Sequence, residues 1–253
     1  QNLVKSLGYT ILPLDINKSG IKWEIEDNIS LRQPLSSIKG LGVTAVEQIL
    51  KNKPYNTIED LLFNESITYT KLNKRAFEAL IKSGCLNSFI DSRFANLKHF
   101  WSVCILNKPK TLKKFSEMIE KYKNEIDFTK EEKIDFISLT TGVFPLEMVI
   151  DNNMSNMLKK KLINPISEFE PSSEVGWCIP KNIETRKTKN NKDYYIVEVL
   201  DSNFVTSKIR CWGVNTKKDT IYLYRPYLVK PNYDSNWGIS TRGSVKNSWK
   251  LLG

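Results

Sequence analysis

A short glycine-containing hairpin, Ile38-Lys39-Gly40-Leu41-Gly42, carries the clearest chemical signal in the sequence. Gly40 can end one helix with a positive φ, and Gly42 can begin the next. The first N–H groups of the second helix are then unpaired at its positive end, where a phosphate can bind. The spacing therefore predicts a sequence-independent contact with a DNA backbone through Lys39, Gly40, Leu41, Gly42 and Thr44. The alternative interpretation is an ordinary turn between two helices, in which the glycines only allow the backbone to turn tightly.

A second group of candidate binding residues lies in the last third of the chain. Residues 174–253 carry 14 Lys and Arg against 7 Asp and Glu, so they hold +7 of the net charge of +10. Aromatic rings inside a positive groove are typical of barrels that bind single strands by base stacking. We therefore expect single-stranded DNA to contact Arg186, Lys187, Lys189, Lys192, Tyr194, Arg210 and Trp212, although strand alternation places some aromatic rings in the core. A basic surface that serves only solubility is the alternative.

No residue pattern predicts catalysis or metal binding. The close acidic pairs, such as Glu24 and Glu26, lie in edge or linker contexts and are expected at the surface. The single histidine, His99, lies in an apolar helical pattern, where we expect packing and not the role of a base. The cysteines are too far apart in the sequence for a zinc or redox motif, so we expect buried free thiols at Cys85, Cys104, Cys178 and Cys211.

The composition is that of an ordered globular protein. Hydrophobic residues make up 40% and aromatic residues 11% of the 253 residues, a length that favours about two domains. The apolar stretches are shorter than the roughly 20 residues that a membrane span needs, so we expect no membrane partner. The chain begins at Gln1 without Met or a signal-peptide pattern, so we expect the numbering to begin inside a longer or processed polypeptide.

The first third of the chain is expected to be mainly helical. Residues 1–8 look like the end of a helix, and the alternation over residues 21–25 predicts a short strand. The hairpin then joins a helix that begins at Pro34 to a second, amphipathic helix. A degenerate second pair follows, in which Asn73 caps a helix over residues 74–82.

The remaining two thirds are expected to contain a helical connector and then a β domain. Amphipathic helices are predicted at 93–106, 111–126 and 130–140. From residue 175 the pattern changes to short β-rich runs, with five strands predicted at 176–185, 194–200, 207–212, 220–229 and 237–240. The prediction is an α+β multidomain protein, with an all-α helix-hairpin-helix module and a helical connector followed by a five-stranded OB-type β-barrel. The expected domains are 1–33, 34–92, 93–171 and 172–253.

Three separate stretches resemble the C-terminal half of the alpha subunit of bacterial DNA polymerase III. They are residues 38–47 together with 80–86, residues 7–19, and residues 136–146. The first stretch is similar to the helix-hairpin-helix region of that family. The second resembles the segment that ends its fingers, with Leu14 in place of the usual second proline. The third resembles its Leu-Gly-x-x-x-x-Gly-His-Pro-Leu stretch, with Phe144 in place of the histidine.

The resemblance implies that residues 1–33 end the fingers, residues 34–92 contact duplex DNA, and the barrel lies near single-stranded template. It implies a DNA-directed DNA polymerase, a nucleotidyltransferase, whose palm carboxylates and Mg²⁺ ions lie outside this chain, upstream or in a separate partner. We therefore expect no catalytic residue, cofactor or metal in this chain, and a cytoplasmic location in a bacterium or a phage-infected host. A sliding clamp is a further candidate partner, although residues 91–135 lack the glutamine that leads the family's clamp-binding peptide.

A split or phage-encoded polymerase would account for these departures from the family pattern. Two other functions stay open, because an OB fold does not fix function. One is a free-standing accessory protein of replication or recombination that binds single strands or junctions, and the other is a protein-binding adaptor. Co-purification with a palm-bearing partner distinguishes a polymerase portion from these two functions, because only a polymerase portion requires such a partner.

Overall fold

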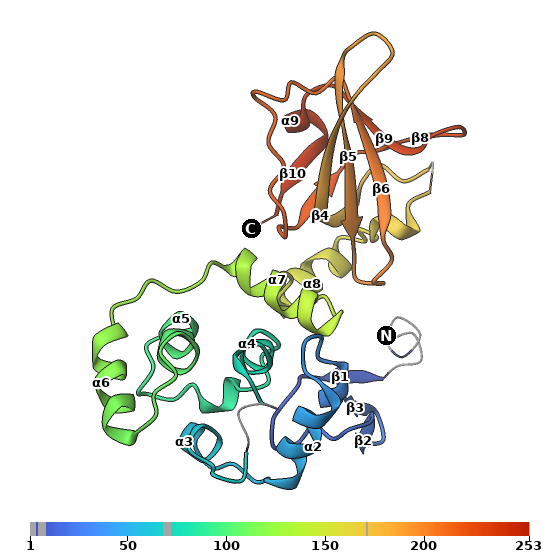
Figure 1. Cartoon of the computed structure of the whole chain (residues 1–253). Helices are drawn as coiled ribbons and strands as arrows, with labels where there is room; N and C mark the ends of the chain where they lie inside the picture. Colours follow the sequence, from blue (N-terminus) through green and yellow to red (C-terminus); the bar gives the residue numbers. More distant parts are fainter. Residues whose placement is uncertain (1–3, 5–8, 68–71, 171, 253) are drawn as a thin grey trace. The chain divides into compact units, whose positions relative to one another are not determined.

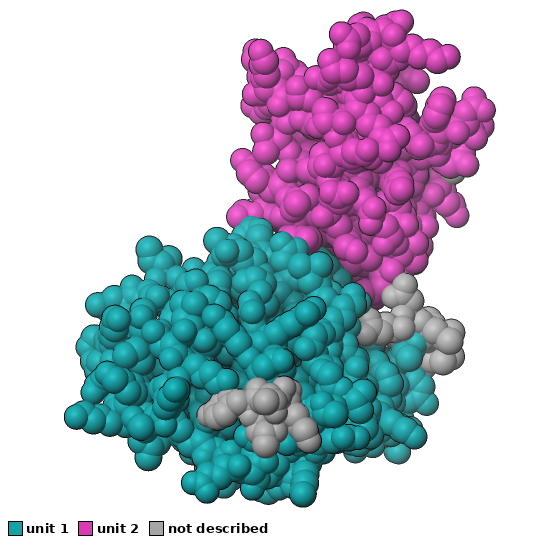
Figure 2. Space-filling view, in the orientation of Figure 1, with its two compact units in different colours: residues 1, 3–144 teal, residues 2, 145–253 magenta. Residues whose placement is uncertain are grey.

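The computed structural model describes residue 4 and the ranges 9–67, 72–170 and 172–252. The helix end predicted within residues 1–8 lies outside the described residues, apart from Val4. The chain forms two compact units, which we call unit 1 (Leu3–Phe144) and unit 2 (Pro145–Gly253) (Figure 1, Figure 2). Residues 145–171, which we expected in the connector, are grouped with the second unit.

Unit 1 contains a small three-stranded sheet in the order β1-β3-β2. Its strands are β1 (Thr10–Leu12), β2 (Glu24–Asp27) and β3 (Ser30–Arg32), and β3 pairs in parallel with β1 and antiparallel with β2. The strand predicted at 21–25 therefore lies slightly later in the chain. Arg32 ties the sheet together, because its buried guanidinium donates to the Glu26 carboxylate and to the carbonyl of Pro13.

The predicted hairpin forms, but its first helix is a single 3₁₀ turn, η1 (Leu35–Ser37). The prediction of a full helix from residue 34 is therefore wrong. The N–H of Lys39, which would continue the turn, donates instead to the carbonyl of Thr140 at 2.8 Å, so the chain leaves the helical path. The second helix, α2 (Val43–Lys51), begins directly after Gly42, as predicted.

Two capped helices follow α2. The helix α3 (Ile58–Leu62), which the sequence analysis missed, begins with a capping box between Thr57 and Asp60. The helix α4 (Lys74–Lys82) has the predicted bounds and the predicted cap, because the side-chain oxygen of Asn73 accepts from the N–H of Ala76 at 3.0 Å. A 3₁₀ turn, η2 (Asn87–Phe89), comes next.

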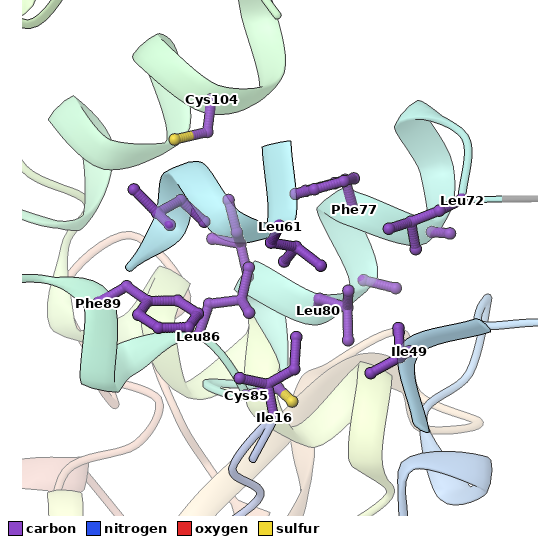
Figure 3. Packing of buried hydrophobic residues seen from close by; sticks show 14 of the residues in the cluster. Ile16, Ile49, Leu61, Leu72, Phe77, Leu80, Cys85, Leu86, Phe89 and Cys104 are labelled. Carbon is purple, nitrogen blue, oxygen red and sulfur yellow. The ribbon is translucent and has the colours of Figure 1, made fainter. Parts of the chain in front are cut away.

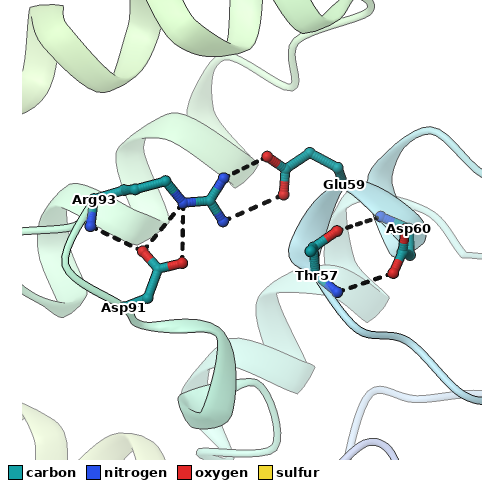
Figure 4. Close-up of polar contacts among 5 residues, drawn as sticks. All are labelled: Thr57, Glu59, Asp60, Asp91 and Arg93. Carbon is teal, nitrogen blue, oxygen red and sulfur yellow. Dashed lines mark hydrogen bonds and ion pairs between the residues drawn. The ribbon is translucent and has the colours of Figure 1, made fainter.

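Arg93 ties α3 to the segment after η2. Its guanidinium lies between two carboxylates, those of Glu59 and Asp91 (Figure 4). The Glu59 carboxylate is the larger cause of the raised pKa of Arg93. Because the side chains are partly exposed, each pair is expected to add only about 1 kcal/mol or less to the free energy of unfolding.

The helices predicted at 93–106, 111–126 and 130–140 are present with changed bounds. The first is α5 (Leu97–Trp101), which continues into a π-helical turn, η3 (Ser102–Leu106). The second is α6 (Leu112–Tyr122), shorter than predicted. The third, α7 (Lys130–Thr141), begins with a capping box and ends at Gly142, whose φ is +72°.

One hydrophobic core runs through unit 1 (Figure 3). Ile49 of α2, Leu80 of α4 and Cys104 of η3 belong to the same cluster of buried residues. Phe100 of α5 and Phe115 of α6 belong to it as well. The hairpin module and the first part of the predicted connector therefore pack as one body.

Unit 2 begins with short helices and continues into a curled sheet of seven strands. The helical elements are η4 (Leu146–Met148), α8 (Asn152–Lys160), η5 (Ile166–Glu168) and, near the end of the chain, α9 (Val245–Ser248). The strands are β4 (Gly176–Lys187), β5 (Asp193–Leu200), β6 (Ser207–Trp212), β7 (Tyr227–Val229), β8 (Asn232–Asp234), β9 (Gly238–Arg242) and β10 (Trp249–Leu251). Their order is β10-β7-β4-β5-β6-β9-β8, and all neighbours are antiparallel except β6 and β9.

The predicted count of five strands is wrong, although the α+β class is confirmed. The strand predicted at 220–229 is formed only by β7, and the chain continues through Lys230-Pro231 into β8. Proline has no N–H to give to a ladder, so a strand breaks there. The strand β10, which pairs with β7, was not predicted. By contrast, β6 has the bounds that alternation predicted.

Alternation along the strands of unit 2 separates an inner face from an outer face. Tyr195, Val197 and Val199 of β5 are buried, as are Ile209 and Cys211 of β6, and all five belong to one core cluster. The residues between them face the other side of the sheet. No helix in the described ranges of either unit is both long and apolar enough to cross a membrane.

Candidate nucleic-acid interfaces

The hairpin of unit 1 has the backbone geometry that its glycines predicted. Gly40 has a φ of +95°, which L side chains rarely adopt. Leu41 is only 8% exposed and belongs to the core, so it anchors the hairpin and leaves its neighbours on the surface. Gly40 and Gly42 are exposed on either side of this anchor, and Lys39 is exposed as well.

The N-terminal end of α2 is open to solvent. Gly42 is its N-cap and has no side chain that could accept from the first N–H groups. A methyl group built on Gly42 would meet no other part of the chain within 4 Å, so nothing packs against this position. Val43 is 67% exposed and Thr44 is exposed as well. This end can therefore receive an anion through backbone N–H groups and the Thr44 hydroxyl.

Arg75 is a second cation beside the hairpin, and the sequence analysis missed it. A methyl group built on Gly40 would lie 3.9 Å from Nε of Arg75 and 3.5 Å from Cβ of Ala79. Both residues belong to α4, so the second helix pair packs directly against the hairpin of the first. This contact joins residues far apart in the sequence, so residue spacing does not predict it. The one available signal was the small side chain of Ala79, which permits close packing on that face of α4.

On the outer face of the sheet in unit 2, four predicted or neighbouring residues form a row across the strands. Arg186 of β4 lies opposite Tyr194 of β5, and Tyr194 lies opposite Trp212 of β6. Trp212 in turn lies opposite Arg242 of β9. Directly paired residues point to the same face of a sheet. Arg210, two residues before Trp212, shares this face. The structure therefore brings together Arg186, Tyr194, Arg210 and Trp212, and adds Arg242, which the sequence analysis did not select.

The rings of this face contact one another. Tyr194 and Trp212 are stacked, with ring centres 4.5 Å apart and an angle of 26° between the planes. Trp237, at the turn between β8 and β9, packs edge-to-face on Trp212 at 6.4 Å. The guanidinium of Arg210 lies 5.4 Å from the centre of the Trp237 ring. These rings are not in the core, whereas Tyr195 and Trp249 are buried.

The cations of the β4–β5 turn differ in how free they are. Arg186 pairs with Glu184 at 2.8 Å, and this guanidinium lowers the pKa of the Glu184 carboxyl. Lys187 donates to the side chain of Asn191 and lies 3.9 Å from an oxygen of Asp193. Asn191 takes a φ of +58° in this turn, a conformation that asparagine adopts more readily than most residues.

Lys189 and Lys192, also in this turn, are exposed, and in the described part of the chain no ion pair involves either ammonium group. They are therefore the two cations of this turn that stay available to an anionic ligand.

The cysteine and histidine side chains, which could act as nucleophiles, bases or metal ligands, are buried. All four cysteines are free and buried, as predicted, and burial raises their pKa values, that of Cys211 to about 11. His99 is fully buried; its Nδ1 accepts from the N–H of Ala95 at 3.1 Å, and its Nε2 lies 2.8 Å from the carbonyl oxygen of Ile119. His99 therefore links α5 to the end of α6. Among the residues with described positions, no three His, Cys, Asp or Glu side chains are grouped as metal ligands.

Comparison with known proteins identifies the motif that contains the hairpin of unit 1. Residues 8–96 match the family model described as a helix-hairpin-helix motif. The chain is 28% identical over 222 residues to the DNA polymerase III alpha subunit of Aquifex aeolicus, an alignment that covers 83% of this chain and 18% of that protein. It is 38% identical over 90 residues to the alpha subunit of Bacillus subtilis, covering 35% of this chain and 8% of the relative. With the alpha subunit of Pseudomonas aeruginosa it shares 30% identity over 114 residues, covering 44% of this chain and 10% of the relative.

The chain spans less than a fifth of the length of these relatives. The alignment with the Aquifex aeolicus protein extends over most of this chain, including parts outside the helix-hairpin-helix match. The resemblance found in the sequence is thereby confirmed: this chain is similar to a portion of the alpha subunit of bacterial DNA polymerase III, and residues 8–96 carry a helix-hairpin-helix motif.

Proposed function

We propose that the chain is the DNA-binding C-terminal portion of a replicative polymerase similar to the DNA polymerase III alpha subunit. In this proposal the hairpin of unit 1 holds the backbone of duplex DNA. The observation that carries it is the open end of α2, where Gly42 leaves unpaired N–H groups and empty space inside a matched helix-hairpin-helix motif. Lys39 and Arg75 supply positive charge beside this end, as a phosphate site needs.

Unit 2 is proposed to be an OB-type barrel that binds the single-stranded template. Two connections support this fold, because β7 returns to pair with β4 and β9 returns to pair with β6. The return of β7 beside β4, with β4, β5 and β6 as successive antiparallel neighbours, is a Greek-key connection, on which the OB fold is built, whereas β9 joins β6 in parallel. The strands β7 and β8 follow each other across Pro231 and together take the place of one longer strand.

The ligand of unit 2 is proposed from the chemistry of its outer face. Tyr194 and Trp212 present aromatic surface, and Arg186, Arg210 and Arg242 share their face of the sheet. Single strands bind where bases meet aromatic rings and phosphates meet cations. Catalysis, with Mg²⁺ at palm carboxylates, is assigned to a palm-bearing segment or partner, and a sliding clamp is a further proposed partner.

The test of the hairpin is Gly42→Val. The φ of Gly42 is −73°, a value open to any residue, and an added Cβ atom meets no neighbouring atom within 4 Å, so we expect a change in stability below about 1 kcal/mol. The side chain should fill the space through which a phosphate approaches. We expect the affinity for duplex DNA to fall about tenfold or more, equally for unrelated base sequences.

Affinity is measured by fluorescence anisotropy with labelled duplexes, beside a thermal melting curve. Ser88→Val, at an exposed position elsewhere in unit 1, is the matched control. If Gly42→Val binds duplex DNA as the unchanged protein does, the hairpin is not the duplex site.

A further inference from the structure

Trp237 is the most accessible ring of the aromatic cluster in unit 2. It is 54% exposed, whereas Tyr194 and Trp212 are half-buried. Tyr194 and Trp212 also use one face of each ring on one another, at 4.5 Å. A nucleobase cannot stack on a ring face that another ring already covers. The free aromatic surface of the cluster is therefore mainly that of Trp237.

The position of Trp237 is fixed by contacts on both sides of its peptide backbone. Its N–H donates to a carboxylate oxygen of Asp234 at 3.1 Å, and its carbonyl accepts from Nη1 of Arg210 at 2.6 Å. Gly238, with a φ of +70°, then turns the chain into β9. The backbone of Trp237 is thus tied to both Asp234 and Arg210, while more than half of the side chain stays open to solvent.

The surroundings of the ring suit a nucleobase. Arg210 lies 5.4 Å from the centre of the Trp237 ring, and Trp212 packs on the ring edge-to-face at 6.4 Å. A guanidinium beside an indole strengthens stacking through cation–π attraction and places positive charge near the phosphates of the same strand. A ring held in place before binding also loses little conformational entropy when a base arrives.

We propose that one base of single-stranded DNA stacks on Trp237, and that Arg210 and Trp212 are positioning residues for this ring. This inference rests on the proposed binding of single strands by the outer face of unit 2. It differs from the expectation drawn from the sequence, in which Tyr194 and Trp212 are the rings that contact the single strand. Trp212 instead supports the ring that does.

The test compares the full chain with Trp237→Ala and Trp237→Phe on two probes. One probe is a short oligo(dT), and the other is the same sugar–phosphate backbone without bases. We expect Trp237→Ala to bind oligo(dT) about tenfold more weakly and Trp237→Phe to recover most of the loss. Binding of the abasic probe and the slope of affinity against salt should stay unchanged, because stacking involves no phosphate. Trp23→Ala, which removes a 42% exposed tryptophan from unit 1, is the matched control.

Each other outcome overturns the inference in a recognisable way. Equal affinity of Trp237→Ala and the unchanged protein for oligo(dT) shows that the base stacks elsewhere. Equal losses on the two probes, or a flatter salt slope, show that Trp237 only holds Arg210 in place. If the unchanged, folded chain binds neither probe at low salt, the proposed single-strand function of unit 2 fails, and the inference fails with it. Should Trp237→Ala lower the melting temperature, Trp237→Leu, which keeps apolar bulk without an aromatic face, takes its place in the same comparison.

Discussion

Lysine and arginine side chains in unit 2 differ in their freedom to meet a phosphate. Arg186 and Lys187 already have carboxylate partners in Glu184 and Asp193, at 2.8 and 3.9 Å. A phosphate must compete with these carboxylates, although exposed pairs are weak. Lys189 and Lys192 have no such partner in the described ranges and lie in the same turn. The charge available to DNA is therefore smaller than a count of basic residues suggests.

Replacing both Lys189 and Lys192 by Ala should flatten the salt dependence of single-strand binding. The slope of log affinity against log salt is expected to fall by about 0.7 for each phosphate that the protein no longer neutralises. It is measured by titrating a labelled oligo(dT) at several salt concentrations. The matched control removes Lys217 and Lys218, two exposed lysines of another loop in the same unit. If the two double variants flatten the slope equally, the β4–β5 turn has no special role.

One buried carboxylate organises the loop between β6 and β7. Asp219 is 6% exposed, and its oxygens accept from the N–H of Asn215, the hydroxyl of Ser244 and the N–H of Val245. Burial by itself raises the pKa of Asp219, but these hydrogen bonds outweigh it and hold the pKa below its ordinary value of 3.8. The ionised carboxylate thereby fastens the loop to the start of α9.

Asp219→Asn should lower the free energy of unfolding of unit 2 by about 2 kcal/mol at neutral pH, because an amide has one acceptor oxygen where the carboxylate has two. A carboxyl whose pKa is lowered by folding stabilises the protein above its unfolded pKa, and this contribution is lost as the pH falls through the folded value. The difference between variant and unchanged protein should therefore shrink below pH 3.8. Urea unfolding at both pH values measures it, with the exposed Glu174→Gln as control. A difference that does not depend on pH would contradict this account.

Elements with local signals could be predicted from the sequence, and contacts between distant segments could not. The helix α4 and its Asn73 cap follow from residues next to one another, and so does the alternation that defines β6. The parallel pairing of β6 with β9 joins segments some 30 residues apart, and it alone brings Arg242 beside Trp212. In the same way, only the packing of α4 on the hairpin places Arg75 beside Gly40. The candidate residues missed by sequence reasoning all belong to this second kind.

The two candidate interfaces belong to different units, and each unit has its own hydrophobic core. One core holds the hairpin of unit 1 in place, and the other lies under the inner face of the sheet in unit 2. Neither core contains a described group of carboxylates arranged to hold metal ions. Under the proposed function, which assigns catalysis to a palm-bearing segment or partner, DNA binding and nucleotide addition are expected to be separable.

We predict that the highly purified chain binds DNA but adds no nucleotide to a primer in the presence of Mg²⁺. Addition requires palm carboxylates that hold the metal ions, and no such set is identifiable in the sequence. Primer extension on a labelled template measures this, with and without an added palm-bearing polymerase segment. Extension by the chain alone would show that the assignment of catalysis to another segment or partner is wrong.

The hairpin of unit 1 contains two glycines whose reasons for being glycine differ. Gly40 needs its identity for the backbone, because its φ is +95° and a side chain would lie against α4. Gly42 has an ordinary φ of −73°, and a Cβ atom there would meet no neighbouring atom within 4 Å, so neither its backbone nor its surroundings require a glycine. Folding alone therefore constrains position 40 more tightly than position 42. Under the proposed function, the glycine at position 42 serves the approach of a ligand and not the path of the backbone.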